Sequence, residues 1–299
     1  MIVAVTGATG FLGRYIVRHL AEAGHSCRCW SRPRSDRGGY DDIEDRITWV
    51  DGDLSDESSM RELVAGADAV VHAALDRPGR GFRGAEGEVP AFVERNVVGS
   101  LRLIEAARAA GAGRFIFIST CAVHEEILED RKLDEAHPLW PTSHYGAHKA
   151  AIEKFIHSYG LGEAYDICAI RPTGIYGVAR PLDQSKWYEI VRNVKAGQPV
   201  ASAKGGKEVH AADVARAVLV LLTAEGVAGQ AYNCYDLYVA EQDVARIAKD
   251  ITGSNSDIAA LNKGPVHQID TRKIRSLGVE FGGKVQLEAT VGEMLEWMD

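Results

Sequence analysis

Residues 2–13 read IVAVTGATGFLG, and this stretch decides the fold class. The run IVAVT is apolar and β-branched, which is typical of a buried strand. Glycines at positions 7, 10 and 13 follow it, and the periodicity over residues 11–23 predicts a helix. A glycine turn between a strand and a helix allows a pyrophosphate to approach the positive end of that helix. The stretch therefore predicts a dinucleotide site, with these expected contacts: Gly7, Thr9, Gly10, Phe11, Leu12 and Gly13.

The first half of the chain continues to alternate strand and helix patterns. Further strands are predicted at residues 26–31, 47–53, 68–74, 114–120 and 164–172. Such alternation indicates crossover units, and the nearly continuous apolar runs suit strands that are covered on both faces. We expect an α/β fold with a doubly wound, Rossmann-type parallel sheet over residues 1–173. A smaller lobe, mainly substrate-binding, should occupy residues 174–299, with a helix at 210–224 and a possible return of the chain to the sheet.

Composition narrows the class of protein. The 299 residues are 46% hydrophobic, and the net charge of -8 disfavours nucleic acid or an anionic membrane as a partner. No apolar run approaches the roughly 18 residues of a membrane span. The five cysteines are irregularly spaced and suggest no disulfide framework, so we expect a cytoplasmic protein.

The segment HYGAHKAAIEKF, residues 144–155, predicts a helix that carries side chains suited to proton transfer. Tyr145 and Lys149 are four residues apart and share a face of that helix. A nearby ammonium favours the phenolate, so Lys149 should lower the pKa of Tyr145 from about 10 and make it a proton donor or acceptor. His144 and His148 lie on a face turned by about 100° from this pair, and we interpret them as surface or packing residues and not as metal ligands.

The end of the second predicted strand bears on the choice of cofactor. A site that prefers NAD carries an acidic residue there, which binds the ribose 2′-hydroxyl. This chain has Ser31 at that point, followed by Arg32 and Arg34, and arginine suits a 2′-phosphate. NADP is therefore the preferred cofactor, with NAD as the alternative.

With these residues in hand, the chain resembles the extended short-chain dehydrogenase/reductase family, which includes the NAD(P)-dependent nucleotide-sugar epimerases and dehydratases. The resemblance runs in order through TGATGFLG (6–13), DGDL (51–54), VVHAA (70–74), ERNVVGSLRLIEAA (94–107), FIFISTCAVH (115–124), YGAHK (145–149) and IRPTGIYG (170–177). It implies catalytic roles for Thr120, Tyr145 and Lys149, the lysine also binding the nicotinamide ribose. It further implies these cofactor contacts: Asp53 and Leu54 at the adenine, Ala73 and Ala74 at the middle, Asn96 ordering the site, and Pro172 to Ile175 at the nicotinamide.

The resemblance implies an oxidoreductase or epimerase that transfers a hydride at a carbinol or carbonyl carbon of a sugar or nucleotide-sugar. Family members that dehydrate sugars carry an Asp-Glu pair after the catalytic threonine, whereas this chain has Cys121 and Ala122. A 4,6-dehydratase is therefore disfavoured. Nucleotide-sugar enzymes also tend to carry Asn and Arg where this chain has Gly174 and about Gly206, although Lys204 and Lys207 could meet a phosphate.

Several alternatives stay open at this stage. A reductase of a small non-sugar aldehyde or ketone is a rival, and a non-catalytic NAD(P) sensor is the alternative of another class. The partners expected are a small-molecule substrate and, by analogy with the family, a second copy in a homodimer. His72 is interpreted as a packed core residue, and thiol catalysis by Cys121 is disfavoured because the sequence places no base for it. His210 and Asp213 are interpreted as capping the helix at 210–224, and a His210 that faces the substrate is the alternative.

Overall fold

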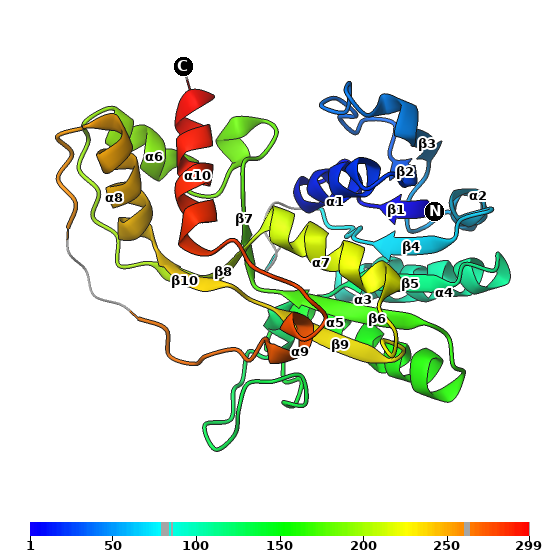
Figure 1. The fold of residues 1–299 in the computed structure, drawn as a ribbon. Coiled ribbons are helices and arrows are strands. Elements are labelled where there is room, and N and C mark those ends of the chain that lie inside the picture. The colour runs from blue at the N-terminus through cyan, green and yellow to red at the C-terminus, as the bar shows by residue number, and fades with distance from the viewer. Residues whose placement is uncertain (79–83, 85, 260–263, 299) are drawn as a thin grey trace. The chain divides into compact units, whose positions relative to one another are not determined.

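The computed structural model describes residues 1–78, 84, 86–259 and 264–298, which form two compact units (Figure 1). Unit 1 comprises Met1–Pro172, Ala215–Cys234 and Asp270–Val279. Unit 2 comprises Thr173–Val214, Tyr235–Ile269 and Glu280–Asp299. The chain thus leaves unit 1 and returns to it twice, so neither unit is one continuous segment.

Unit 1 is built on a seven-stranded sheet in the order β3-β2-β1-β4-β5-β6-β9, and neighbouring strands are parallel. The strands are β1 (Ile2–Thr6), β2 (Ser26–Ser31), β3 (Ile47–Asp51), β4 (Ala69–His72), β5 (Arg114–Ile118), β6 (Ile167–Pro172) and β9 (Gln230–Cys234). The strand order changes direction between β1 and β4. Ligands of open α/β sheets bind at the carboxyl ends of strands at such a point. The doubly wound parallel sheet predicted from the sequence is confirmed.

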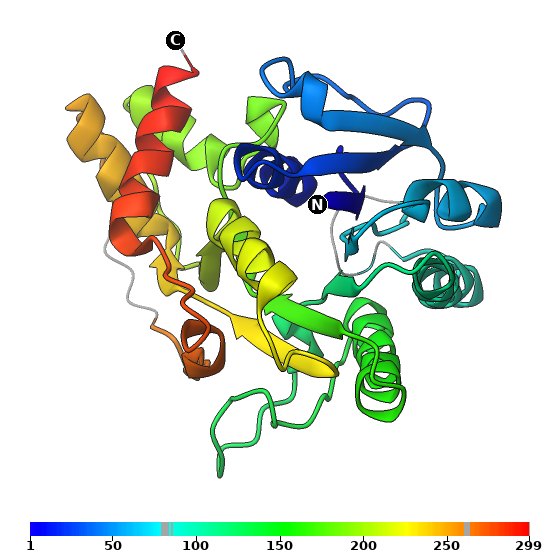
Figure 2. The same cartoon turned by 45° about the vertical axis from the view of Figure 1, so that its right-hand side comes forward.

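Helices cover both faces of this sheet (Figures 1 and 2). The helices of unit 1 are α1 (Phe11–Glu22), α2 (Glu57–Val64), α3 (Val89–Val93), α4 (Gly99–Ala109), α5 (His144–His157) and α9 (Arg272–Arg275), while α7 (Ala211–Thr223) begins in unit 2 and ends in unit 1. On one face, α2, α4 and α5 enclose a core that includes Leu63, Leu103 and Ile152. On the other face, α1 and α7 lie against the sheet, and Arg114 of β5 donates to the Leu221 carbonyl of α7.

The predicted strands lie at the correct places in the chain, but their predicted ranges are slightly too long. The strand expected at 164–172 begins at Ile167, and the strand expected at 114–120 ends at Ile118. The shortening at the carboxyl end leaves Ser119 and Thr120 beyond β5, although the Ser119 amide still donates to the Ile170 carbonyl of β6 at 2.8 Å. Because nearly all of each strand is buried, its apolar run marked the centre and not the ends.

Unit 2 has its own small core. A three-stranded sheet in the order β10-β8-β7 joins β7 (Gly174–Tyr176), β8 (Gly205–His210) and β10 (Leu237–Ala240). Helices α6 (Tyr188–Lys195), α8 (Glu241–Thr252) and α10 (Gly283–Glu296) pack around apolar residues such as Val191, Val244 and Val291. In the described part of the chain, none of the helices combines the length and the hydrophobicity that a membrane crossing needs.

Candidate active site

The turn between β1 and α1 has the geometry that a pyrophosphate requires. Gly7 has φ +72°, and a Cβ there would lie 2.8 Å from the carbonyl of Ala73 at the end of β4. At Gly13 a Cβ would lie 2.0 Å from the Gly7 carbonyl oxygen, so helix and turn approach too closely for any other residue. The Gly10 amide closes the turn on the Gly7 carbonyl at 2.9 Å, and α1 begins at the next residue. Its first turn, residues 11–14, carries no acidic side chain to repel an anion.

The other predicted contacts of this turn lie around it. Thr9, Phe11 and Leu12 are partly exposed, and the Phe11 ring packs edge-on against Tyr15 at 5.6 Å. The residues present therefore fit a dinucleotide, because the glycines leave the backbone bare at the amino end of a helix at the sheet's switch point.

His72 is a satisfied core residue, as the sequence suggested. Its Nδ1 lies 2.7 Å from the Thr6 hydroxyl and its Nε2 lies 2.8 Å from the Ser100 hydroxyl. Burial lowers its pKa to about 3, so the imidazole is neutral. The same Thr6 hydroxyl accepts the amides of Ala73 and Ala74 at 3.1 Å, which fixes the strand end where we expect the middle of the cofactor.

Asn96 holds the chain that follows β4. Its amide oxygen accepts the Asp76 amide at 2.8 Å, and its amide nitrogen donates to the Asp76 carbonyl at 2.8 Å. The helix α3, the turn η2 (Glu94–Val98) and α4 are continuous, which gives Asn96 a rigid base. The segment after β4, residues 76–90, is rich in glycine, and its residues 79–83 and 85 lie outside the described residues.

At the end of β2, the Ser31 side chain binds an arginine that the sequence analysis did not identify, Arg37. The Arg37 guanidinium donates to the Ser31 hydroxyl at 2.8 Å and forms an ion pair with Asp51. Arg32 and Arg34 are exposed, and neither forms an ion pair with a residue that the structure describes. Farther along, Asp53 accepts the Ser55 amide at 2.8 Å and Leu54 is buried.

Thr120, Tyr145 and Lys149 come together at the carboxyl end of β5. Ser143 caps α5 by accepting the Gly146 amide at 3.1 Å, and the Glu125 carboxylate in turn accepts the Ser143 amide at 2.8 Å. This double cap fixes the first turn of α5, on which Tyr145 lies. The Tyr145 and Thr120 side chains are hydrogen-bonded to each other.

The electrostatics of Tyr145 differ from the expectation. Burial raises the pKa of its phenol, and this outweighs the hydrogen bond with Thr120 and the positive charge of Arg77, which both lower it. Lys149 does not supply the lowering, because its Nζ is turned to the Ile118 carbonyl at 2.7 Å and lies 4.4 Å from the centre of the Phe117 ring. The spacing of four residues placed both groups on one face, but the sequence could not show which acceptor the ammonium would choose.

Lys149 is itself strongly perturbed. Its side chain is buried, and burial lowers its pKa to about 7, while the Glu153 carboxylate one turn later opposes that effect. Among the described residues, the Ile118 carbonyl is the one hydrogen-bond acceptor of the ammonium. The other two N–H donors are thus available to a ligand.

The remaining candidates of the sequence are packing or surface residues. His148 is buried between the rings of Phe92 and Tyr145, whereas His144 is exposed, and the described residues contain no group of three side chains that could hold a metal. The Cys121 thiol donates to the Arg171 carbonyl at 3.0 Å, and burial raises its pKa to about 12, so it is not a nucleophile.

In unit 2, the capping interpretation holds for His210, whose Nδ1 accepts the Ala212 amide at 3.1 Å. Asp213 was expected to cap the same helix, yet its carboxylate accepts the Gly282 amide before α10 at 3.2 Å. Its place in the first turn of α7 agrees with the sequence analysis, and its bond to Gly282 is a further contact that the sequence did not indicate. Pro172 ends β6 in unit 1, and Ile175 lies in β7 of unit 2.

Sequence reasoning also missed charged groups around Thr120, Tyr145 and Lys149. Glu153 and Arg171 form an ion pair of 2.6 Å with both side chains almost fully buried. Glu86 is buried and accepts the Tyr145 amide at 3.2 Å. Only Glu153 had a signal in the sequence, since it follows Lys149 by one helical turn.

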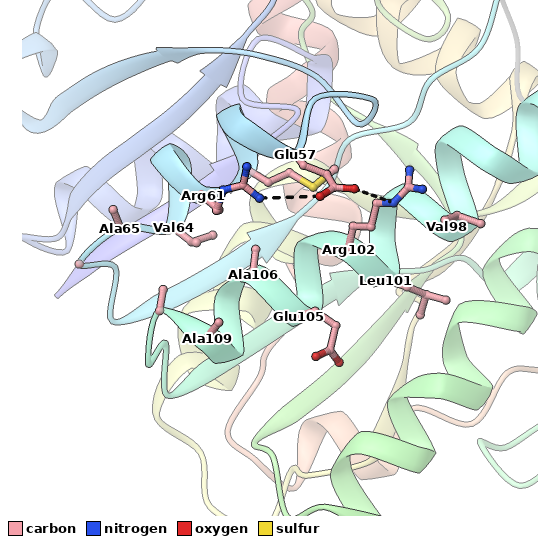
Figure 3. Close-up of a pocket in the computed structure, with 13 residues that line it drawn as sticks. Glu57, Arg61, Val64, Ala65, Val98, Leu101, Arg102, Glu105, Ala106 and Ala109 are labelled. Carbon is pink, nitrogen blue, oxygen red and sulfur yellow. Dashed lines mark ion pairs between the residues drawn. The ribbon is translucent and has the colours of Figure 1, made fainter.

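Unit 1 also carries a groove of about 760 Å³ between α2 and α4 (Figure 3). Its lining is mostly apolar, with Met60, Val64 and Leu101, and Arg61 and Arg102 both pair with Glu57 at its rim. None of the predicted catalytic or cofactor-binding residues lines it, so it is a separate feature of the surface.

Comparison with known proteins gives consistent matches. A profile of the NAD dependent epimerase/dehydratase family matches residues 3–234. The chain is 30% identical to the low-salt glycan biosynthesis protein Agl12 of Haloferax volcanii, over 94% of this chain and 93% of that one. It is 29% identical to a dTDP-glucose 4,6-dehydratase of Streptomyces niveus, over 99% and 92%. The crystal structure of DesIV, a dTDP-glucose 4,6-dehydratase from Streptomyces venezuelae with NAD and TYD bound, matches with a TM-score of 0.79 and 25% identity, over 99% of this chain and 97% of that one.

Proposed function

The chain belongs to the NAD-dependent epimerase/dehydratase family, and from this premise we propose that Thr120, Tyr145 and Lys149 are its catalytic residues. The protein is an NAD(P)-dependent enzyme that acts by hydride transfer at a carbinol or carbonyl carbon of a sugar or nucleotide-sugar. The observation that carries the assignment is the hydrogen bond between Tyr145 and Thr120, with the Lys149 ammonium buried one turn further along α5.

The residues divide the work in a simple way. Thr120 orients the substrate oxygen through its hydroxyl, and Tyr145 takes the proton of a carbinol during oxidation or gives it back to a carbonyl during reduction. The raised pKa keeps the phenol protonated at neutral pH, which suits the reductive direction. Lys149 binds the nicotinamide ribose with its remaining donors. When bound, the dinucleotide supplies the hydride acceptor or donor.

Elimination chemistry has little support in this site. Cys121 and Ala122 stand directly after Thr120, and neither is an acid or base at neutral pH, since the pKa of Cys121 is raised to about 12 by burial. Glu125, the next carboxylate in the sequence, is engaged by the amides of Thr142 and Ser143. We therefore place the protein among the epimerases, dehydrogenases and reductases and not among the 4,6-dehydratases.

The substrate proposed is a sugar that does not need a diphosphate carrier. In unit 2, a Cβ at Gly174 would lie 2.5 Å from one Glu208 oxygen, and a Cβ at Gly206 would lie 2.4 Å from the other. Both glycines thus accommodate a buried carboxylate, which pairs with Lys186 at 2.5 Å. Neither glycine offers a side chain that could bind a diphosphate, so free sugars should be turned over in preference to nucleotide-sugars in a substrate panel. Small non-sugar aldehydes and ketones belong in the same panel.

The finer assignments concern cofactor, location and assembly. NADP is the proposed cofactor because Arg32 and Arg34 are exposed at the end of β2, and NAD remains the alternative. A cytoplasmic location agrees with the five free cysteines. We propose a homodimer through the groove between α2 and α4, because its lining is mostly apolar and the arginines and glutamates at its rim can oppose those of a second copy.

Tyr145→Phe tests the catalytic assignment, since it removes the hydroxyl and keeps the ring. We expect turnover to fall by about 10²- to 10⁴-fold, with dinucleotide binding retained in a fluorescence titration. Tyr159→Phe, just beyond α5, is the matched control and should keep its turnover. Full turnover in Tyr145→Phe would show the role to be wrong, and dinucleotide binding without turnover on the whole panel would favour a sensor.

A further inference from the structure

A buried network of charges lies behind the catalytic residues, and Glu153 is at its centre. The Glu153 carboxylate receives the Ser119 hydroxyl at 2.5 Å and two nitrogens of Arg171 at 2.6 and 3.0 Å. Glu153 and Arg171 are each 1% exposed, so the pair is almost fully desolvated. A buried pair of this kind adds little stability compared with apolar residues, so its presence calls for another reason.

Each partner of Glu153 is adjacent in sequence to a residue of the site. Ser119 precedes Thr120, Arg171 precedes Pro172, and Lys149 lies one turn before Glu153 on α5. The network therefore joins β5, β6 and α5 at the place where their catalytic side chains emerge. Beyond Arg171, its guanidinium reaches His124 Nε2 at 3.1 Å and the Glu135 carbonyl at 3.4 Å, and the Glu135 carboxylate accepts the Asn233 amide at 2.8 Å.

Lys149 needs a nearby negative charge. Burial lowers the pKa of the ammonium to about 7 even with Glu153 in place, so loss of that carboxylate would lower the pKa further. Among the described residues, Glu153 is the one carboxylate whose charge acts on Lys149 to oppose this effect. Arg171 pairs with that carboxylate at 2.6 Å and so fixes its place beside α5.

The other groups packed around Lys149 do not supply this charge. His72 on β4 and His148 on α5 are neutral, because burial lowers the pKa of each to about 3, and Lys149 itself adds to that lowering. Burial keeps Tyr145 and Cys121 protonated by raising the pKa of both. The remaining ionisable groups are Arg77 and Glu86 near Tyr145, and His124, Glu135 and Arg171 on the far side of Glu153.

We propose that Glu153 is a positioning residue for hydride transfer: it holds Lys149 in its charged form and anchors Ser119 beside Thr120. The inference rests on the proposed catalytic roles of Tyr145 and Lys149. It differs from a merely structural role, because it ties the protonation of Lys149 to one carboxylate that never touches substrate or cofactor.

The test follows the titration of Lys149 directly. Protein labelled with ¹³C at the lysine Cε is titrated by NMR, and Lys149→Arg assigns the signal. In Glu153→Gln, loss of the negative charge should lower the titration point of Lys149 by about one pH unit or more. Glu135→Gln, which removes another carboxylate on the far side of Arg171, is the control and should leave that point unchanged. In Glu153→Asp the charge and the titration point should remain.

Activity gives the second readout. Since Lys149 acts as the ammonium, kcat/KM falls as pH rises through its pKa, and in Glu153→Gln this descending limb should move to lower pH with Lys149. If Glu153→Gln leaves Arg171 unpaired and does not fold, the double variant Glu153→Gln/Arg171→Gln removes both charges and should show the same shift.

The outcomes separate this inference from the proposed function. An unchanged titration point of Lys149 in Glu153→Gln, or in the double variant, would overturn the role of Glu153. So would an equal loss of turnover in Glu153→Asp and Glu153→Gln with both pH limbs in place, which is the result of a structural role. The NMR titration needs no substrate, whereas full turnover in Tyr145→Phe would overturn the catalytic assignment and leave the titration result intact.

Discussion

At the scale of single residues, the position of a side chain on a helix does not determine which polar or charged group it contacts. The spacing of Tyr145 and Lys149 placed them on one face of α5, which is the geometry that the site uses. The sequence did not show that Lys149 would bind the Ile118 carbonyl, or that burial would raise the pKa of Tyr145. Those effects depend on β5, which is about thirty residues away in the chain.

The choice between NADP and NAD also depends on single residues. Arg37 is engaged by Ser31 and Asp51, whereas Arg32 and Arg34, also exposed at the end of β2, form no ion pair with a residue that the structure describes. Their replacement in Arg32→Ala/Arg34→Ala should weaken NADP binding by about 10-fold or more, because charge-assisted hydrogen bonds to a phosphate contribute roughly 1.5–3 kcal/mol each. Isothermal titration with NADP and NAD measures the effect.

Affinity for NAD should change little in that variant, since NAD lacks the 2′-phosphate. Arg46→Ala, an exposed arginine next to β3, serves as the control. Equal losses for NADP and NAD, or none for either, would contradict the preference.

At the scale of elements, the turn between β1 and α1 is limited by space as well as by conformation. Gly13→Ala would place a methyl group 2.0 Å from the Gly7 carbonyl, so α1 must shift away from the turn. We expect a loss of about 3 kcal/mol of stability, at the upper end for overpacking, together with weaker dinucleotide binding. Thermal unfolding with and without the dinucleotide measures both.

Gly162→Ala is the matched control, because a Cβ there meets no atom within 4 Å. A melting temperature for Gly13→Ala equal to that of Gly162→Ala, with dinucleotide binding retained, would rule out the close approach as a requirement.

At the scale of the whole molecule, the groove between α2 and α4 is the surface that we assign to the homodimer. Leu101→Glu puts a charge into its apolar lining and should shift the protein from twice the mass of one chain to the monomer in light scattering. Leu161→Glu changes a leucine that is 68% exposed and does not line the groove, so the dimer should persist. A wild-type monomer at micromolar concentration, or equal behaviour of the two variants, would refute the assembly.

Local sequence determined the features that depend on neighbours along the chain. The apolar runs gave the strands, the glycines gave the turn at Gly7 to Gly13, and the helical spacing gave the pair Tyr145 and Lys149. Ordered motifs gave the family and with it the class of reaction. Each of these signals is short in range, because it reflects burial, backbone conformation or the helical period.

Only the tertiary structure decided which distant groups meet. It brought Glu153 to Arg171 and Ser119, Arg37 to Ser31, and Asp213 to Gly282. It also returned the chain from unit 2 to unit 1, where β9 joins the seven-stranded sheet. A charge acts through space and not along the chain, so the partner of a buried ionisable group is fixed by packing, and the pKa values of the site follow from that packing.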